Sequence, residues 1–195
     1  MSILVLTSDT LIGTPATGNI EYNGQFYGTD SNASRAQIQR ITQGTAVAST
    51  SGTSITFSSL PAWVKRVTVM FANVSLSGSA NLLLQIGSGS ITNTGYASAA
   101  ANIYNGSSPQ TASNTTGFLL QTASGATEVN SGTVVLTNIT GNTWVSAGNI
   151  TETSGRSRTS GGFIALGGVL DRVVITTTNG TDTFDLGTVN ILYEG

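Results

Sequence analysis

Few side chains in this sequence are of the types that perform covalent chemistry. Its 195 residues include no cysteine and no histidine, and charged residues make up 8% of the chain. A thiolate nucleophile, an imidazole base and a zinc site of cysteine and histidine are excluded because their atoms are absent. The many serines lack a histidine to activate them. We therefore expect a protein that is not an enzyme and that carries no cofactor.

Carboxyl groups are the remaining catalytic candidates. A glycosidase needs two of them facing each other across a cleft, about 5 to 9.5 Å apart. Glu128 and Glu152 are candidates for such a pair. Both lie in polar segments between apolar runs, where a carboxylate is normally solvated. We interpret both as solvated loop residues and retain a carbohydrate-active, tailspike-like enzyme only as a remote alternative.

A second acidic group follows Asn179. Oxygen atoms of Asn179, Asp182 and Asp185 are of the type that Ca²⁺ accepts in irregular cages, although their spacing is not that of an EF-hand. A turn between two strands, with Asp185 capping backbone N–H groups, explains the same residues. We favour the turn and predict no metal site.

Two polar segments carry residue types that suit carbohydrate binding. One is the predicted loop 105–116, and the other is the predicted loop 152–161. Tyrosine and arginine beside asparagine and serine can stack on a glycan and hydrogen-bond to it, and loops on a rigid scaffold often carry binding sites. The expected receptor contacts are Tyr104, Asn105, Arg156 and Arg158.

The elements that must position these residues are short strands. From about Thr45 onward, apolar runs are separated by turn residues, and no segment has a convincing period of 3.6. The expected strands are 54–58, 64–71, 82–86, 117–122, 132–137, 143–147, 162–166, 172–177 and 188–193. Strands without intervening helices predict an all-β fold, an antiparallel jelly-roll-like sandwich over residues 45–195. Trp63 and Trp144 adjoin strand patterns and are expected in the core or at a subunit contact.

Residues 1–44 differ from the rest because large apolar groups become sparse after the first run. Asn23-Gly24 lies between two short β-type runs and predicts a hairpin. Residues 33–41 fit either one helical turn or a short strand. We predict an extended N-terminal arm that attaches the protein to a partner. The apolar residues expected to serve this attachment are Ile20, Tyr22, Phe26, Tyr27, Ile38 and Ile41.

The charge and hydropathy of the sequence exclude two classes of binding partner. The net charge is −2, and seven lysines and arginines are spread thinly, whereas nucleic-acid binding needs a dense basic surface. No apolar run approaches the length of a membrane span, and the opening run is too short for a secretion signal. We expect no nucleic-acid and no membrane partner. A surface with so little charge does not repel a copy of itself, which favours a homo-oligomer.

Several segments resemble a known family. TGNIEYNG at 17–24, followed by FYGT at 26–29, resembles a short segment that recurs in tail-fibre and related virion proteins of tailed bacteriophages. LPAWVKRV at 60–67 resembles the opening of a domain found at the C-terminal end of such fibres. Three further segments resemble the ending of that domain: 170–173, 179–184 and 190–193.

The resemblance implies a homotrimeric, β-rich virion component that is made in the host cytoplasm. Long fibres carry a shaft between these two parts, and this chain has none. Two roles are therefore expected. The first is a short tail fibre, anchored to a tail or baseplate protein and presenting its sandwich to a host surface glycan. The alternative is a decoration (cement) protein that binds the major capsid protein and stabilises the head.

Overall fold

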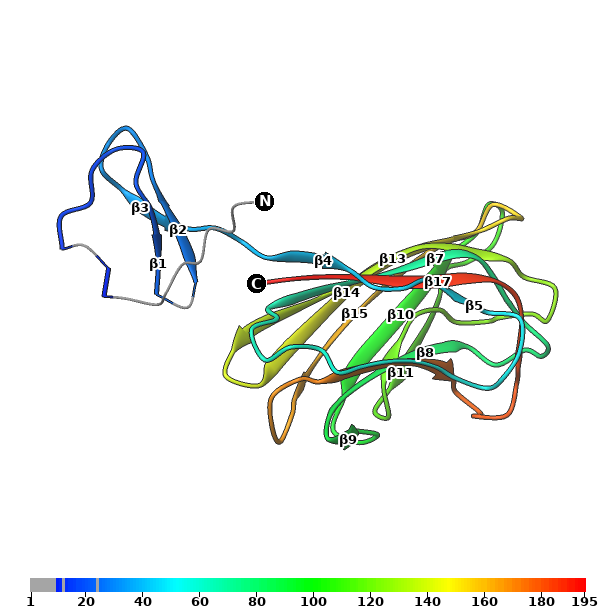
Figure 1. The fold of residues 1–195 in the computed structure, drawn as a ribbon. Coiled ribbons are helices and arrows are strands. Elements are labelled where there is room, and N and C mark those ends of the chain that lie inside the picture. Colours follow the sequence, from blue (N-terminus) through cyan, green and yellow to red (C-terminus); the bar gives the residue numbers. More distant parts are fainter. Residues whose placement is uncertain (1–9, 12, 24) are drawn as a thin grey trace. The chain divides into compact units, whose positions relative to one another are not determined.

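The structure is a computed structural model that describes residues 10, 11, 13–23 and 25–195. All regular elements of these residues are β-strands, and all of their pairings are antiparallel (Figure 1). The chain divides into two units, residues 1–40 and residues 41–195. The expected all-β class is confirmed.

The first unit contains a three-stranded sheet in its described part. Its strands are β1 (Ile20–Tyr22), β2 (Phe26–Thr29) and β3 (Arg35–Gln37). β1 and β2 form the hairpin that Asn23-Gly24 predicts, with Tyr22 opposite Phe26; Gly24 itself lies outside the described residues. Arg35 holds the sheet from the third strand, because its Nε donates to Oε2 of Glu21 at 2.8 Å.

The apolar residues predicted for attachment fall in both units. Ile20, Phe26 and Ile38 are exposed in the first unit. Ile41 instead begins β4 (Ile41–Gln43), which pairs with the last strand of the second unit. The prediction that the arm extends to residue 44 therefore includes a strand that belongs to the sandwich. Composition gave no sign of this, because β4 holds one apolar residue.

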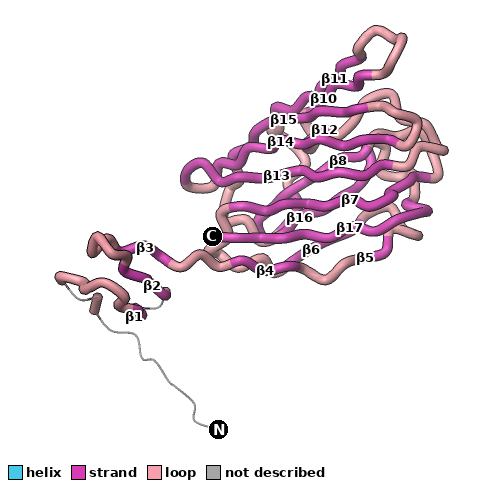
Figure 2. Tube along the Cα trace, turned by 90° about the horizontal axis from the view of Figure 1, so that it is seen from above, coloured by secondary structure: helices cyan, strands magenta, loops and turns pink. Residues whose placement is uncertain are grey.

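Residues 41–195 form two sheets (Figures 1 and 2). The larger sheet, in spatial order, contains β11 (Gln110–Asn114), β10 (Ala97–Ile103), β15 (Ser157–Ala165), β14 (Thr143–Glu152), β13 (Asn130–Thr140), β7 (Arg66–Leu76), β17 (Phe184–Glu194) and then β4, with β5 (Val47–Ala48) also on β17. The smaller sheet contains β12 (Phe118–Leu119), β8 (Leu82–Ser88), β16 (Arg172–Thr177) and β6 (Ile55–Ser58), with β9 (Ser90–Ile91) on β8.

The connections between these sheets follow the jelly-roll pattern. Along the chain, β6, β7, β8 and β10 alternate between the smaller and the larger sheet. β11 stays in the larger sheet, β12 returns to the smaller one, and β16 inserts between β8 and β6. In place of a single strand between β12 and β16, the larger sheet has the meander β13–β14–β15. The sandwich is thus jelly-roll-like in its connections, with the meander β13–β14–β15 and the hairpin β10–β11 both adding strands to the larger sheet.

Alternating side chains from the two sheets form the core. Val67 and Val69 of β7 are fully buried, whereas Arg66 on the opposite face is exposed, as the alternation predicts. Trp144 is buried in the core, and Trp63 packs at its margin with its ring centroid 5.8 Å from that of Tyr193. The expected core position is confirmed for Trp144, whereas Trp63 is only partly buried.

Each of the nine expected strands overlaps an observed strand, but β5, β9, β10 and β11 lie where no strand was expected. β10 has the sequence ASAAANI, rich in alanine, and β11 falls inside the predicted loop 105–116. Similarly, β15 begins at Ser157, inside the predicted loop 152–161. These segments have few β-branched or aromatic side chains, so their propensity is weak. Pairing with neighbouring strands determines their conformation.

The edge of β17 is covered by residues 41–49. β4 pairs with Leu192–Glu194, β5 pairs with Val189 and Thr188, and the intervening N–H of Gly44 donates to the Ile191 carbonyl at 2.7 Å. A side chain at Gly44 would meet the Ile191 side chain at 2.8 Å, so this position requires glycine's small size. The two short strands therefore protect an otherwise open sheet edge.

Candidate functional site

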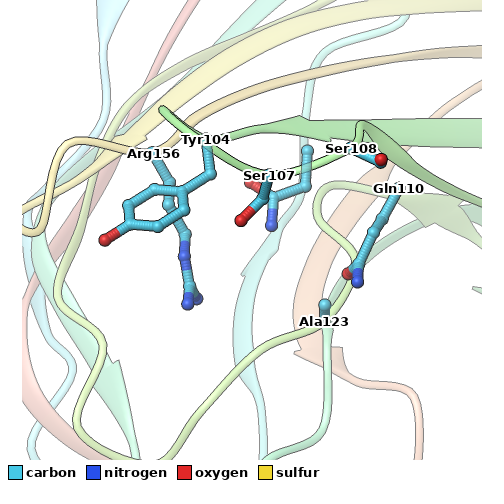
Figure 3. A pocket seen from close by; sticks show the side chains of 7 residues that line it. Tyr104, Ser107, Ser108, Gln110, Ala123 and Arg156 are labelled. Carbon is cyan, nitrogen blue, oxygen red and sulfur yellow. The ribbon is translucent and has the colours of Figure 1, made fainter.

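Three connections of the sandwich meet at a polar pocket of about 160 Å³ (Figure 3). They link β10 to β11, β12 to β13 and β14 to β15. The lining residues come from all three connections and from the strands beside them: Asn102, Tyr104, Ser107, Ser108, Gln110, Ala123 and Arg156. In Figure 3, Tyr104 and Arg156 lie against each other on one side, with Gln110 and Ser108 on the other.

Local turns fix the loops around this pocket. The β10–β11 loop turns where the Ser107 N–H donates to the Tyr104 carbonyl at 3.2 Å, and Gly106 takes a positive φ of 78° there. This is the turn chemistry that Asn105-Gly106 predicts. The β14–β15 hairpin closes with the Glu152 N–H donating to the Arg156 carbonyl at 2.9 Å. Arg156 is therefore held at the base of a tight turn.

Arg156 joins the rim of the pocket to the network beneath it. Its guanidinium carbon lies 5.1 Å from the centroid of the Tyr104 ring, a cation–π arrangement. Its Nη1 donates to Oε1 of Glu128. Tyr104 stays 39% exposed, so part of its surface is available to a ligand.

Arg158 has a different environment, because none of its surface is exposed. Its Nη1 donates to Oε1 of Gln121 at 3.0 Å and to Oδ1 of Asn130, and its Nη2 donates to Oε2 of Glu128. Its Nε has no partner among the described residues. The prediction that Arg158 contacts a receptor as a loop residue is wrong, because β15 has already begun and directs this side chain inward.

The two glutamates are also buried, so their interpretation as solvated loop residues is wrong. Each oxygen of the Glu128 carboxylate accepts from one arginine, Arg156 or Arg158. Glu152 accepts from the N–H of Ser154 at 3.1 Å and from the hydroxyl of Thr153 at 3.3 Å. Both carboxylates therefore hold the loops in position.

Opposing effects act on the Glu152 carboxyl. Burial raises its pKa, but hydrogen bonds from Ser154 and Thr153, together with the charge of Arg158, outweigh this effect and leave the pKa below its ordinary value. A carboxyl whose pKa is lower in the folded state contributes stability above its unfolded pKa of about 4.3. That contribution disappears as the pH falls through the folded pKa.

We therefore expect Glu152→Gln to reduce the loss of stability on acidification. The difference in unfolding free energy between about pH 7 and about pH 3, measured by urea unfolding, should be smaller in the variant than in the wild type. Asp185→Asn provides the control, since the Asp185 side chain is exposed on β17. An equal reduction in both variants would contradict the prediction.

The structure brings together only part of the predicted receptor site. Tyr104 and Arg156 line the same pocket, Asn105 is exposed in the adjoining loop outside the lining set, and Arg158 lies buried below. Sequence reasoning missed Asn102, which is 6% exposed and whose Oδ1 has no hydrogen-bond partner among the described residues. Asn102 could have been found if residues 97–103 had been recognised as a strand. In a strand that buries Ser98 and Ala100, the alternation of side chains also directs Asn102 inward.

The acidic segment after Asn179 forms a turn, as favoured. Oδ1 of Asn179 accepts from the N–H groups of Thr181 and Asp182 at 3.0 and 3.1 Å, and Oδ2 of Asp182 accepts from the Ala80 N–H at 2.8 Å. The sequence predicts that Asp185 caps backbone N–H groups of this turn, but Asn179 and Asp182 accept those hydrogen bonds instead. Within the described residues, no three acidic side chains are grouped in a way that would hold a metal ion.

Among the described residues, no helix is long and apolar enough to span a membrane. Comparison with protein-family models, with curated proteins and with solved structures finds no match to this chain.

Proposed function

We propose that this protein is a non-enzymatic structural component of a bacteriophage virion, a short trimeric tail fibre whose sandwich contacts the host surface. The observation that carries the proposal is the pocket at which three loops of a rigid sandwich meet. Loops on such a scaffold are favourable places for recognition. The resemblance of segments 17–29 and 60–67 to fibre proteins supplies the virion context.

The chemistry of the pocket supports binding rather than turnover. Both oxygens of Glu128 are engaged by arginines, and Glu152 is engaged by its own turn. Neither carboxylate lines the pocket, whose wall consists of neutral polar groups together with Tyr104, Ala123 and Arg156. The candidate glutamate pair is thus committed to structure, and this argues against the tailspike-like alternative.

Attachment is assigned to the first unit. Ile20, Phe26 and Ile38 expose apolar surface there, although the unit has few large apolar side chains to spare. Exposed apolar groups on a small sheet are suited to packing against a partner. We propose that this surface binds a tail or baseplate protein and so anchors the chain in the virion.

A homotrimer agrees with the outer face of the larger sheet. One row across six paired strands consists of uncharged residues: Ala99, Gly161, Ala147, Val135, Thr68 and Leu192. Small uncharged side chains allow two surfaces to approach closely without repulsion. Sedimentation at micromolar concentration should return the mass of a trimer, and a monomer mass would contradict this part of the proposal.

A capsid decoration protein is the second candidate. The observation in its favour is that residues 41–195 follow Arg40 directly, so no shaft separates the attachment unit from the sandwich. A clamp between neighbouring capsomers needs two binding units joined by a short connection. In this reading the first unit and the sandwich bind the major capsid protein, and the pocket has no receptor role.

The copy number per particle tests both candidates. Quantitative gel staining of purified virions should give on the order of tens of copies for a fibre and hundreds for a decoration protein, as the family resemblance implies for assemblies of closed symmetry. Immunogold labelling should place a fibre at the tail. Labelling over the head would select decoration, and absence from purified virions would overturn the virion assignment itself.

A further inference from the structure

We propose that the pocket between Tyr104, Arg156 and Asn102 binds a single neutral saccharide residue. The proposal deepens the receptor-binding function proposed above by naming the class of ligand. Three observations carry it: the charge balance under the pocket, a buried acceptor in its wall, and the exposed ring at its rim.

The charges below the pocket cancel. Two arginines, Arg156 and Arg158, face two glutamates, Glu128 and Glu152, and Glu128 already accepts from both arginines. An acidic sugar or a phosphate requires arginine donors that are free to form a charge-assisted pair. Arg158 is inaccessible, and the charge of Arg156, which pairs through Nη1 with Glu128 and stacks on Tyr104, is already balanced by that carboxylate. The site therefore favours a neutral ligand over an anionic one.

One side chain of the pocket wall has a buried oxygen that accepts no hydrogen bond from the described residues. Asn102 lines the pocket and is nine-tenths buried, and its Oδ1 is without a hydrogen-bond partner among the described residues. Buried polar atoms are nearly always paired, so an unpaired one at a pocket wall points to a missing group. A ligand hydroxyl would donate to Oδ1 once the Asn102 amide turns this buried oxygen toward the pocket, and the hydroxyl would leave its own oxygen free to accept.

The rest of the lining suits a molecule with several hydroxyls. Ser107, Ser108 and Gln110 offer both donors and acceptors without charge. The Tyr104 ring adds apolar surface with a polar tip, against which the C–H face of a sugar ring can pack. A polyol whose two faces differ in polarity therefore matches this wall better than a purely apolar ligand does.

The size of the pocket limits the ligand to one ring. Its volume of about 160 Å³ lies below the range of about 300–1,000 Å³ that holds a drug-sized ligand. A nucleotide or an enclosed oligosaccharide would exceed it. The structure thus assigns a terminal or protruding sugar unit of a surface glycan, with the remainder of the chain outside.

Saturation-transfer NMR on the full chain provides the test. The probes are the methyl glycosides of glucose, galactose, mannose and N-acetylglucosamine, with N-acetylneuraminic acid and glucuronic acid as anionic comparators. We expect at least one neutral glycoside to bind with a Kd in the millimolar range, more tightly than either acid. Asn102→Ala and Tyr104→Ala should each weaken that binding about tenfold, the effect of losing one directed contact.

A matched pair of variants controls for indirect effects. Gln110→Ala removes a lining side chain, whereas Thr111→Ala changes the neighbouring exposed residue of β11, which does not line this pocket. Only the first should weaken binding, with unchanged thermal unfolding in both. Preference for an acid, no binding of any neutral glycoside, or binding that the lining variants leave intact would overturn the inference. The copy number in virions is independent of the pocket, so the two proposals fail separately.

Discussion

Replacing Arg158 with methionine should lower the free energy of unfolding by about 3 to 5 kcal/mol, the cost of breaking a fully buried ion pair. The substitution leaves Glu128, a residue that is 8% exposed, without one of its two arginines. It also removes the donors to Gln121 and Asn130. Urea unfolding measures the loss.

Two further variants distinguish burial of charge from simple loss of an ion pair. Arg66→Met breaks a pair with Glu194 at 2.9 Å in which the arginine side chain is 53% exposed, so its cost should stay below about 1 kcal/mol. The double variant Arg158→Met with Glu128→Leu removes both buried charges and should recover much of the lost stability. If Arg158→Met costs no more than Arg66→Met, the buried network does not hold the sandwich together.

The hydrogen bonds of the buried Arg158 also determine the shape of the pocket. Arg158 fixes one oxygen of Glu128, the other oxygen fixes Arg156, and Arg156 stacks on Tyr104. These contacts link strand β15, which carries Arg158, to the β12–β13 connection, then to the β14–β15 connection and finally to the β10–β11 connection. Arg158 is therefore a positioning residue for the rim, although it does not line the pocket itself.

The sequence predicts the strands whose side chains alternate clearly between apolar and polar. Residues 172–177 match β16 at both ends, and residues 64–71 identify β7, because valine alternates with polar groups or lies in a continuous buried run. β10 and β11 were missed because alanine and serine carry little periodic signal. Their conformation depends on pairing with β15 and with each other, which sequence spacing does not encode.

In the candidate site too, local features could be predicted and contacts between distant segments could not. Tyr104 and Arg156 were identified from residue type and from turns that could be recognised locally. The pairing of Glu128 with arginines 28 and 30 residues further along the chain could not be predicted, because it depends on which loops share one end of the sandwich. A polar residue just before a strand and one just inside it look alike in the sequence, yet Arg156 reaches the rim and Arg158 the interior.

Two N-terminal truncations should differ in whether the sandwich stays folded and monodisperse. A variant that begins at Ile41 keeps β4 and β5 on the edge of β17, and we expect it to fold, with an unfolding free energy close to that of the full chain. A variant that begins at Thr50 loses both strands, together with the Ser49 N–H that donates to the Gly187 carbonyl at 2.9 Å. It leaves the N–H and C=O groups of β17 open to pairing between molecules. We expect this variant to aggregate, as size-exclusion chromatography will show.

The same pair of variants separates attachment from folding. A start at Thr45, the boundary that composition predicts, would remove β4 and mix the two effects. The variant from Ile41 avoids this, because it lacks only the unit to which we assign attachment. It should keep the circular dichroism spectrum and the glycoside binding of the full chain, and should be absent from virions assembled in its presence. Normal incorporation would show that residues 1–40 have no anchoring role, and equal solubility of the two variants would show that β17 needs no cover.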